Sequence, residues 1–204
     1  MIAVLVLAAG LSRRMGDANK LLLPWRGKTI FETVVDALVK VKDVEIIIVA
    51  GEQTNLVKTL FPDPFIQIIY NARFKEGMTS SIQAGVGAAG ASAAGYMICL
   101  ADMPFIRTEE YQLLANAFEE EIKTNPKTII IPVFQNKKGN PVIFSAHYKS
   151  QILTHTESEG CKKIVQNAGG SVKLIDMPSA NILKDIDVPE DYYNYLISHN
   201  LPDV

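Results

Sequence analysis

A short segment near the N-terminus combines small residues with positive charge. The apolar run at 2–7 leads into an Ala-Ala-Gly sequence at 8–10, and Arg13, Arg14 and Lys20 follow, with one acidic residue among them. Small residues let backbone N–H groups approach phosphate oxygens, and fixed cations balance the phosphate charge. The alternative is an ordinary strand-to-helix connection with solvated arginines. The length and the positive charge of the segment favour a phosphate-binding loop instead. The segment therefore predicts a nucleotide site.

An aspartate later in the chain could hold a metal ion beside that phosphate. Asp102 directly follows an apolar run at 96–101, so its carboxylate would project at the carboxyl edge of a sheet. A hard divalent ion bound to a triphosphate takes oxygen ligands of this kind. A turn or helix-capping aspartate fits the same position equally well, and the residues alone leave both interpretations open.

Two further segments are ambiguous in the same way. At 76–81 a Glu-Gly pair precedes Met, Thr and two serines, and the backbone N–H groups and hydroxyls of such a helix start can line a base or phosphate pocket. The same residues could simply cap the helix. At 185–189 the sequence Asp-Ile-Asp-Val-Pro is typical of a helix start, with Asp187 as the N-cap and Asp185 on a solvated face.

Several common catalytic motifs do not occur in the sequence. The letters Gly-x-Gly-x-x-Gly appear at 85–90, but inside an Ala-rich helical segment rather than between a strand and a helix, so they do not predict dinucleotide binding. No Gly-Lys-Ser/Thr follows the N-terminal loop at the spacing that a Walker A motif requires, so this motif is excluded. His147, His155 and His199 lack metal-ligand spacing, and no serine or cysteine lies in a nucleophile motif. A covalent catalytic intermediate is therefore not expected.

Composition narrows the class of protein further. A chain of 204 residues with 48% hydrophobic residues suits a single domain, expected to span 1–204. The net charge of -2 and the pI near 5.9 argue against a nucleic-acid-binding surface. The two cysteines form no Cys-x-x-Cys pattern, and neither a signal-peptide pattern nor a bilayer-length apolar stretch is present. These features predict a cytoplasmic protein with no membrane partner.

Apolar runs alternate with helical patterns along the chain. We expect strands at 2–7, 45–50, 67–70, 96–101, 128–132, 141–144 and 172–175, and helices at 29–41, 54–60, 80–91, 108–123, 160–167 and 189–199. This alternation predicts an α/β fold whose mostly parallel sheet is covered on both faces, with ligands at the carboxyl ends of the strands. The polar turn at 136–141 predicts a hairpin, and so an antiparallel excursion late in the chain.

Five blocks of the sequence occur in a characteristic order. They are LAAGxSxRMG at 7–16 with KLL at 20–22, EGMxxSI at 76–82, LADMP at 100–104, GNPVIF at 139–144 and DIDxPEDY at 185–192. Together they extend over nearly the whole chain and resemble the nucleotidyltransferases that act on the molybdenum cofactor, most closely their cytidylyltransferases. The resemblance implies a Rossmann-like three-layer α/β/α sandwich and Mg²⁺-dependent transfer of a nucleoside monophosphate.

The resemblance also implies roles for individual residues. Arg14, Lys20 and Asp102 would be catalytic, because the two cations would hold the triphosphate and Asp102 would bind Mg²⁺. Asp187 would be the second carboxylate on the metal, and Ser81 would lie near the base or ribose. The implied substrate-binding residues are Leu7, Ala8, Ala9, Gly10, Ser12, Arg14, Lys20, Gly77, Ser80, Ser81 and Asn140. Asn140 stands where relatives often carry histidine.

The implied reaction transfers CMP from CTP to the terminal phosphate of molybdopterin and releases pyrophosphate. The cytidylyltransferases tend to read Leu-Ala-Ala-Gly where the guanylyltransferase carries two glycines, so the sequence at 7–10 favours CTP. The alternatives among enzymes are GTP with the same pterin, or a sugar or polyol phosphate as acceptor. Outside the enzymes, the alternative is a carrier or chaperone that delivers the pterin to a client molybdoenzyme, although such a carrier needs no metal carboxylates.

Overall fold

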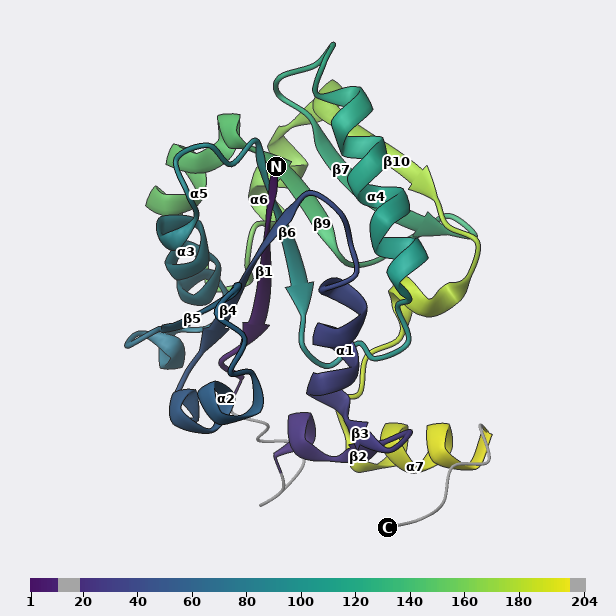
Figure 1. Cartoon of the computed structure of the whole chain (residues 1–204). Coiled ribbons are helices and arrows are strands. Elements are labelled where there is room, and N and C mark those ends of the chain that lie inside the picture. Colours follow the sequence, from purple (N-terminus) through teal and green to yellow (C-terminus); the bar gives the residue numbers. More distant parts are fainter. Residues whose placement is uncertain (11–18, 199–204) are drawn as a thin grey trace.

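A mixed β-sheet runs through the centre of the computed structural model, which describes residues 1–10 and 19–198 (Figure 1). Its strands are β1 (Ile2–Ala8), β4 (Val44–Ala50), β5 (Ile66–Tyr70), β6 (Gly95–Leu100), β7 (Ile129–Phe134), β9 (Val142–Ser145) and β10 (Val172–Asp176), with β8 (Lys137–Lys138) beside β7. The strand order is β10-β7-β9-β6-β1-β4-β5. β1 pairs in parallel with β4 and β6, whereas β9 pairs antiparallel with β6 and β7. The predicted α/β fold with a mostly parallel sheet and a late antiparallel excursion is confirmed.

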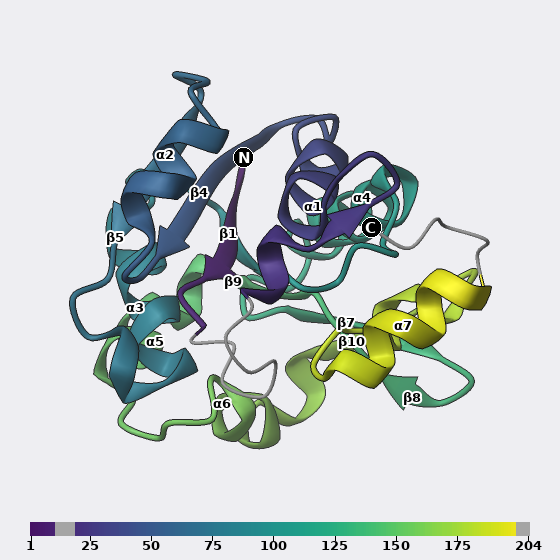
Figure 2. The same cartoon turned by 90° about the horizontal axis from the view of Figure 1, so that it is seen from below.

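Helices cover both faces of this sheet. They are α1 (Ile30–Leu38), α2 (Thr54–Leu60), α3 (Met78–Ala88), α4 (Thr108–Glu121), α5 (Lys149–Thr154), α6 (Lys162–Asn167) and α7 (Pro189–Ser198). Seen from below, α1, α2 and α4 lie on one side of the sheet and α3, α5 and α6 on the other (Figure 2). The layers therefore form the expected α/β/α sandwich.

The central strand β1 explains why the sheet is apolar on both faces. Val4 and Val6 belong to the hydrophobic cluster under α1 and α4, whereas Ala3 and Leu5 belong to the cluster under α3. All four side chains are fully buried. A strand buried on both faces reads as a continuous apolar run, which is the pattern seen at 2–7.

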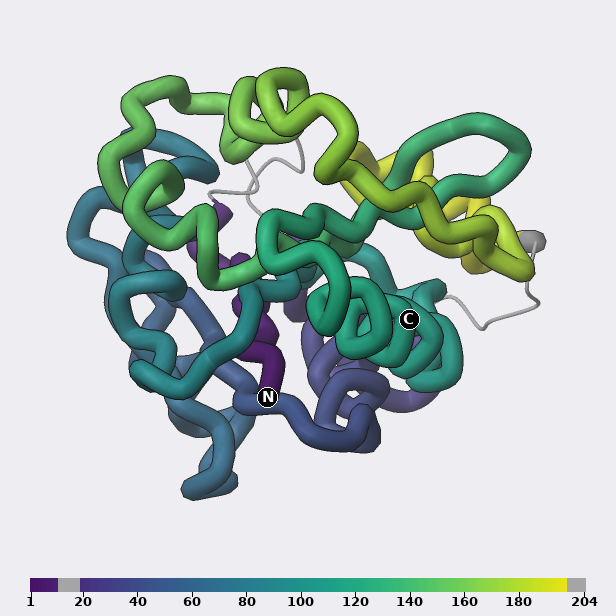
Figure 3. Tube along the Cα trace, turned by 90° about the horizontal axis from the view of Figure 1, so that it is seen from above, coloured from purple at the N-terminus to yellow at the C-terminus, as the bar shows by residue number. Residues whose placement is uncertain are grey.

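The strands of this parallel core share one direction. β1 starts at the amino terminus in the upper half of the molecule and runs downward (Figure 1). The view from above looks onto the half of the molecule in which β1 starts (Figure 3). The carboxyl ends of β1, β4 and β6 consequently meet at the lower edge, where ligands of open α/β sheets bind.

A third hydrophobic cluster joins the beginning of the chain to its last helix. Trp25 and Ile30 pack there with Phe105, Ile186 and Tyr192. Trp25 belongs to a small hairpin of β2 (Pro24–Trp25) and β3 (Lys28–Thr29). The Tyr192 hydroxyl donates a hydrogen bond of 2.7 Å to the carbonyl oxygen of Pro24. This cluster holds the segments before Trp25 and before α7 next to each other, below the sheet.

The structure corrects some element boundaries. The helix expected at 29–41 ends at Leu38, and the one expected at 80–91 is α3, which begins earlier and ends at Ala88. The late turn is tighter than 136–141, because Gln135 and Asn136 both adopt positive φ and β8 starts directly after them. The sequence prediction omitted the six-residue helix α5 and the β2–β3 hairpin, whose strands of two residues carry no periodicity.

Candidate active site

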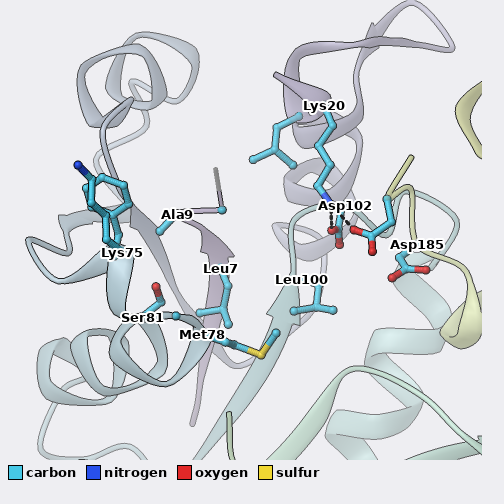
Figure 4. Close-up of a pocket in the computed structure, with 14 residues that line it drawn as sticks. Leu7, Ala9, Lys20, Lys75, Met78, Ser81, Leu100, Asp102 and Asp185 are labelled. Atoms are coloured by element: carbon cyan, nitrogen blue, oxygen red, sulfur yellow. Dashed lines mark hydrogen bonds and ion pairs between the residues drawn. The ribbon is translucent and has the colours of Figure 1, made fainter. Parts of the chain in front are cut away.

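A pocket of about 560 Å³ lies at the carboxyl ends of β1 and β6 (Figure 4). Lys20, Asp102 and Asp185 lie on one wall, where Asp187 contacts Lys20 (Figure 4). Lys75, Met78 and Ser81 lie on the opposite wall, and Phe74 and Gly77, their neighbours in sequence, also line the pocket (Figure 4). Leu7, Ala9 and Leu100 lie between these walls, and Gly10 also lines the pocket. The pocket is therefore formed where the fold predicts a ligand site.

Lys20 forms ion pairs with two aspartates that are distant in sequence. Its Nζ lies 2.6 Å from Oδ2 of Asp102 and 2.9 Å from Oδ1 of Asp187. The Lys20 side chain is only 12% exposed. Burial alone would lower the pKa of Lys20, but the carboxylates of Asp102 and Asp187 outweigh burial and raise that pKa above its usual value. Lys20 is therefore a fixed cation at neutral pH.

Each member of this cluster comes from a different part of the fold. Lys20 begins the short 3-10 helix Lys20–Leu22, whose N-cap Asn19 accepts a hydrogen bond from the Leu21 N–H. Asp102 follows β6, and Asp187 precedes α7. Asp191 accepts hydrogen bonds from the N–H groups of Asp187 and Val188, so it caps α7 and leaves the Asp187 side chain to face the pocket.

Asp102 has an oxygen that accepts no hydrogen bond from the described residues. Its Oδ1 is buried and has no hydrogen-bond partner there. A buried, unpaired carboxylate oxygen is costly unless a cation or a donor reaches it, and carboxylate oxygens are what Mg²⁺ prefers. Within 1–10 and 19–198 no group of three or more His, Cys, Asp or Glu side chains is arranged to hold a metal ion. Asp102 and Asp187 therefore fit a divalent ion as two of its oxygen ligands, with the remaining ligands supplied by water or by a bound molecule.

Asp185 is a third carboxylate of this wall. A solvated face is the simplest interpretation of its sequence position, and the structure shows instead that it lines the pocket with Asp102 and Asp187. Partial burial, followed by the charge of Asp102, raises the pKa of Asp185 above its ordinary value of 3.8. Ile186 between the two aspartates is fully buried, whereas Asp185 and Asp187 on either side of it both line the pocket. This alternation is the signal that could have identified Asp185.

The opposite wall is the start of α3. Gly77 precedes the helix with φ of 103°, a conformation that favours glycine, and provides no side-chain cap. The first N–H groups of α3 are therefore available to a ligand oxygen. Ser81 lines the pocket, whereas the hydroxyl of Ser80 donates to the carbonyl oxygens of Arg73 and Gly77.

The structure brings together part of the residue set expected from the sequence. The residues that line the pocket are Leu7, Ala9, Gly10, Lys20, Gly77, Ser81, Asp102 and Asp187. Three others do not line it. The Ser80 hydroxyl is used inside the protein, Ala8 pairs with Ala50 in the sheet, and the Asn140 N–H donates to Ile182 at 3.0 Å. Ser12, Arg13 and Arg14 lie outside the described residues.

Other pocket residues were not singled out from the sequence. Phe74 and Lys75 form a one-turn 3-10 helix with Glu76, and Met78 opens α3. Phe74 and Lys75 lie directly before the block at 76–82 and Met78 lies within it, so the block is a signal that could have included all three. Leu21 and Leu100 are apolar neighbours of Lys20 and Asp102, and apolar residues of this kind are otherwise typical of the core.

The chain matches a known protein family over most of its length. A model described as the MobA-like NTP transferase domain matches residues 4–172. The chain belongs to this family. The match includes Lys20, Ser81 and Asp102 of the MobA-like domain, while Asp187 follows the matched region.

Individual relatives of this MobA-like protein carry different names. A Methanosarcina acetivorans protein named probable molybdenum cofactor guanylyltransferase is 34% identical over 74% of this chain and 65% of its own length. Nicotine blue oxidoreductase of Paenarthrobacter nicotinovorans is 25% identical over 94% of each chain. The solved structure of Rv0371c from Mycobacterium tuberculosis H37Rv has a TM-score of 0.80 at 23% identity, with 96% of this chain and 97% of that chain covered. That structural likeness establishes the shared fold.

No membrane-crossing helix is found in the part of the chain that the structure describes, because each helix there is too short or too polar.

Proposed function

We propose that this MobA-like protein transfers a nucleoside monophosphate from a Mg²⁺-bound nucleoside triphosphate to the terminal phosphate of molybdopterin. The observation that carries the proposal is the position of the Lys20 ammonium group, within 2.9 Å of both the Asp102 and the Asp187 carboxylates, beside an open pocket. Membership of the family supports nucleotidyl transfer. The names of the Methanosarcina relatives support the molybdenum cofactor as the acceptor.

The proposed step is a direct displacement. A terminal phosphate oxygen of the pterin forms a bond to the α-phosphorus, the bond from that phosphorus to the bridging oxygen of the β-phosphate breaks, and pyrophosphate leaves. A phosphate nucleophile is already ionised near neutral pH, so the step needs no general base. Catalysis then depends on positioning and charge neutralisation.

Residues of the two pocket walls would have different roles in this displacement. Lys20 would neutralise charge on the triphosphate and on the departing pyrophosphate, and the uncapped start of α3 would donate N–H groups to ligand oxygens. Asp102 and Asp187 would hold Mg²⁺, which supplies further charge neutralisation on the phosphates. Arg14 would add a second cation.

GTP is the first candidate for the nucleotide. Three relatives are named guanylyltransferases of the molybdenum cofactor. CTP is the second candidate, because Ala9 stands where the resemblance places a glycine for GTP, and the Ala9 side chain lies in the pocket. A sugar or polyol phosphate remains the alternative acceptor, and a carrier of the pterin remains the alternative outside the enzymes.

An oxidoreductase is a second candidate function, because one relative over nearly the full length is named for that activity. The Gly-x-Gly-x-x-Gly letters do not support it here. They lie inside α3 and at its end, and Gly85 packs against Leu5 and Val49 in the core. Nucleotidyl transfer also explains the paired aspartates, which hydride transfer does not require.

The test incubates the purified protein with Mg²⁺, molybdopterin and either GTP or CTP, and measures pyrophosphate. Release that requires both the pterin and the metal supports the proposal. Tight pterin binding with no release from any nucleotide would indicate a carrier and contradict it. A sugar phosphate that replaces the pterin would correct the acceptor alone.

A further inference from the structure

Asn71 is almost fully buried, with 3% exposure, and its side chain contacts the pocket-lining residue Ser81. It follows β5 and is anchored by its backbone, since its N–H donates to Ala50 at 2.9 Å and its carbonyl oxygen accepts from Phe74 at 3.2 Å. Its side-chain Oδ1 accepts from the Arg73 N–H at 3.0 Å. These three bonds fix both the position and the orientation of the side-chain amide.

The other end of that amide holds two neighbouring serines. Nδ2 of Asn71 donates to Ser80 Oγ at 2.9 Å and to Ser81 Oγ at 3.1 Å. An amide nitrogen has two hydrogens, so this group has one for each hydroxyl. Both serines must therefore accept a hydrogen bond from Asn71, and each keeps its own hydroxyl hydrogen for another partner.

The hydroxyl hydrogens of Ser80 and Ser81 differ in the acceptors available to them. Ser80 directs its hydrogen to the carbonyl oxygens of Arg73 and Gly77, at 2.8 and 2.9 Å. The hydroxyl hydrogen of Ser81 has no acceptor within residues 1–10 and 19–198, and Ser81 lines the pocket (Figure 4). The network is therefore complete except for one donor that faces the ligand site.

We propose that Asn71 is a positioning residue that makes Ser81 a hydrogen-bond donor toward the nucleotide, so that this wall of the pocket selects an acceptor atom of the base or ribose. The inference rests on the proposed function, because it takes a nucleotide as the ligand. One lone pair of the Ser81 oxygen is occupied by the Asn71 amide. A hydroxyl that accepts such a bond is polarised and becomes a better donor.

The variant that isolates this role is Asn71→Asp. The substituted carboxylate has nearly the same shape as the amide and can still accept from the Arg73 N–H, but it has no hydrogens to donate. Ser81 would then turn its own hydrogen toward that carboxylate and present only a lone pair to the ligand. Asn125→Asp is the matched control, since the Asn125 side chain likewise accepts from the N–H two residues later, that of Lys127, away from the pocket.

The experiment measures binding of GTP and CTP with Mg²⁺, by calorimetry, to the wild type, Asn71→Asp, Ser81→Ala and the double variant. Each single variant is expected to bind the better nucleotide roughly three- to tenfold more weakly, which is the effect of one hydrogen bond. The double variant should lose no more than either single variant. Asn125→Asp should bind like the wild type.

Tripolyphosphate with Mg²⁺ separates positioning from a charge effect. It lacks base and ribose, so Asn71→Asp should bind it within about twofold of the wild type, the margin we allow for calorimetric error. If Asn71→Asp fails to fold, Asn71→Ala removes the donor without adding charge, and the same pattern is expected.

Four results would overturn the inference. Losses that add in the double variant would show that Asn71 and Ser81 act independently. An equal loss of tripolyphosphate and nucleotide would assign the effect to charge or to general damage. Wild-type affinity in Asn71→Asp would remove the positioning role while the proposed function stands, whereas a wild type that binds no nucleotide would overturn both.

Discussion

Ile186 donates its backbone N–H to the carbonyl oxygen of Asp102 at 3.0 Å. This bond joins the loop after β6 to the segment before α7, and the Ile186 side chain is fully buried in the cluster around Trp25. Asp187 is thereby held close enough to Asp102 for both carboxylates to contact Lys20. The charged wall of the pocket thus depends on a hydrophobic anchor one residue away from it.

Replacing that anchor should separate activity from general stability. Ile186→Ala removes a fully buried side chain and is expected to lower the free energy of unfolding by about 2–4 kcal/mol. Ile152→Ala is the matched control, because Ile152 is 1% exposed and belongs to the cluster on the other face. Denaturant unfolding should show similar losses for both, while pyrophosphate release should fall clearly only for Ile186→Ala. Equal activities would show that Ile186 does not position Asp187.

Lys20 is expected to act through its charge. Lys20→Met keeps the length of the side chain but removes the ammonium group between Asp102 and Asp187, so turnover should fall roughly 100-fold. Lys28→Met is the control, because Lys28 also pairs with an aspartate, Asp36, but lies outside the pocket. Steady-state kinetics with pyrophosphate detection measures both. A Lys20→Met enzyme within threefold of the wild type would rule out this role.

Ala9 provides a test of nucleotide choice. Its side chain is buried and lies in the pocket, so Ala9→Gly should enlarge the space available to a purine. The ratio of kcat/KM for GTP to that for CTP is expected to rise roughly tenfold, the usual effect of a small volume change in a pocket. Ala8→Gly, at a neighbouring position that does not line the pocket, should leave the ratio unchanged. A ratio that stays constant in Ala9→Gly would show that other residues of the site determine the choice between GTP and CTP.

Glu110 predicts a pH dependence of stability. Burial would raise the pKa of this carboxylate, but hydrogen bonds from Asn181, Ser179 and the Arg107 N–H outweigh burial and lower that pKa below its ordinary value of 4.5. A lowered pKa means that the stabilisation is complete above pH 4.5 and is lost as the pH falls through the folded-state value.

Glu110→Gln should therefore cost about 1–3 kcal/mol at pH 7 and progressively less below pH 4.5. Thermal unfolding at a series of pH values measures the difference. Glu109→Gln, at the exposed neighbouring position, is the control. A constant difference between wild type and Glu110→Gln from pH 7 to pH 3 would contradict the assignment.

Much of the fold could be predicted from the sequence because the sheet is buried on both faces. Runs such as 2–7 are apolar without interruption, and a continuous run of this kind is specific for a covered strand. The β2–β3 hairpin could not be predicted in this way, because its strands are two residues long and its stability comes from Trp25 packing on Phe105 and Tyr192. Such distant contacts leave no local pattern.

The residues of the candidate site could likewise be predicted from the sequence only in part. Lys20 and Asp102 could be proposed because each lies beside the end of a predicted strand or loop, but their 2.6 Å contact depends on the packing below the sheet. Asn71 was not singled out, since a lone asparagine after a strand is ordinary turn chemistry. Its importance arises from two hydroxyls that the fold brings to it, nine and ten residues later.

The central claim is that Asp102 serves nucleotidyl transfer as a metal ligand. The most direct measurement is pyrophosphate release across a Mg²⁺ titration, with molybdopterin and the preferred nucleotide, for the wild type, Asp102→Asn and the exposed control Asp176→Asn. We predict metal-dependent release by the wild type and by Asp176→Asn, and at least about a 100-fold loss in Asp102→Asn with unchanged thermal unfolding. Release by Asp102→Asn within a few-fold of the wild type, at the same Mg²⁺ concentrations, would contradict the claim.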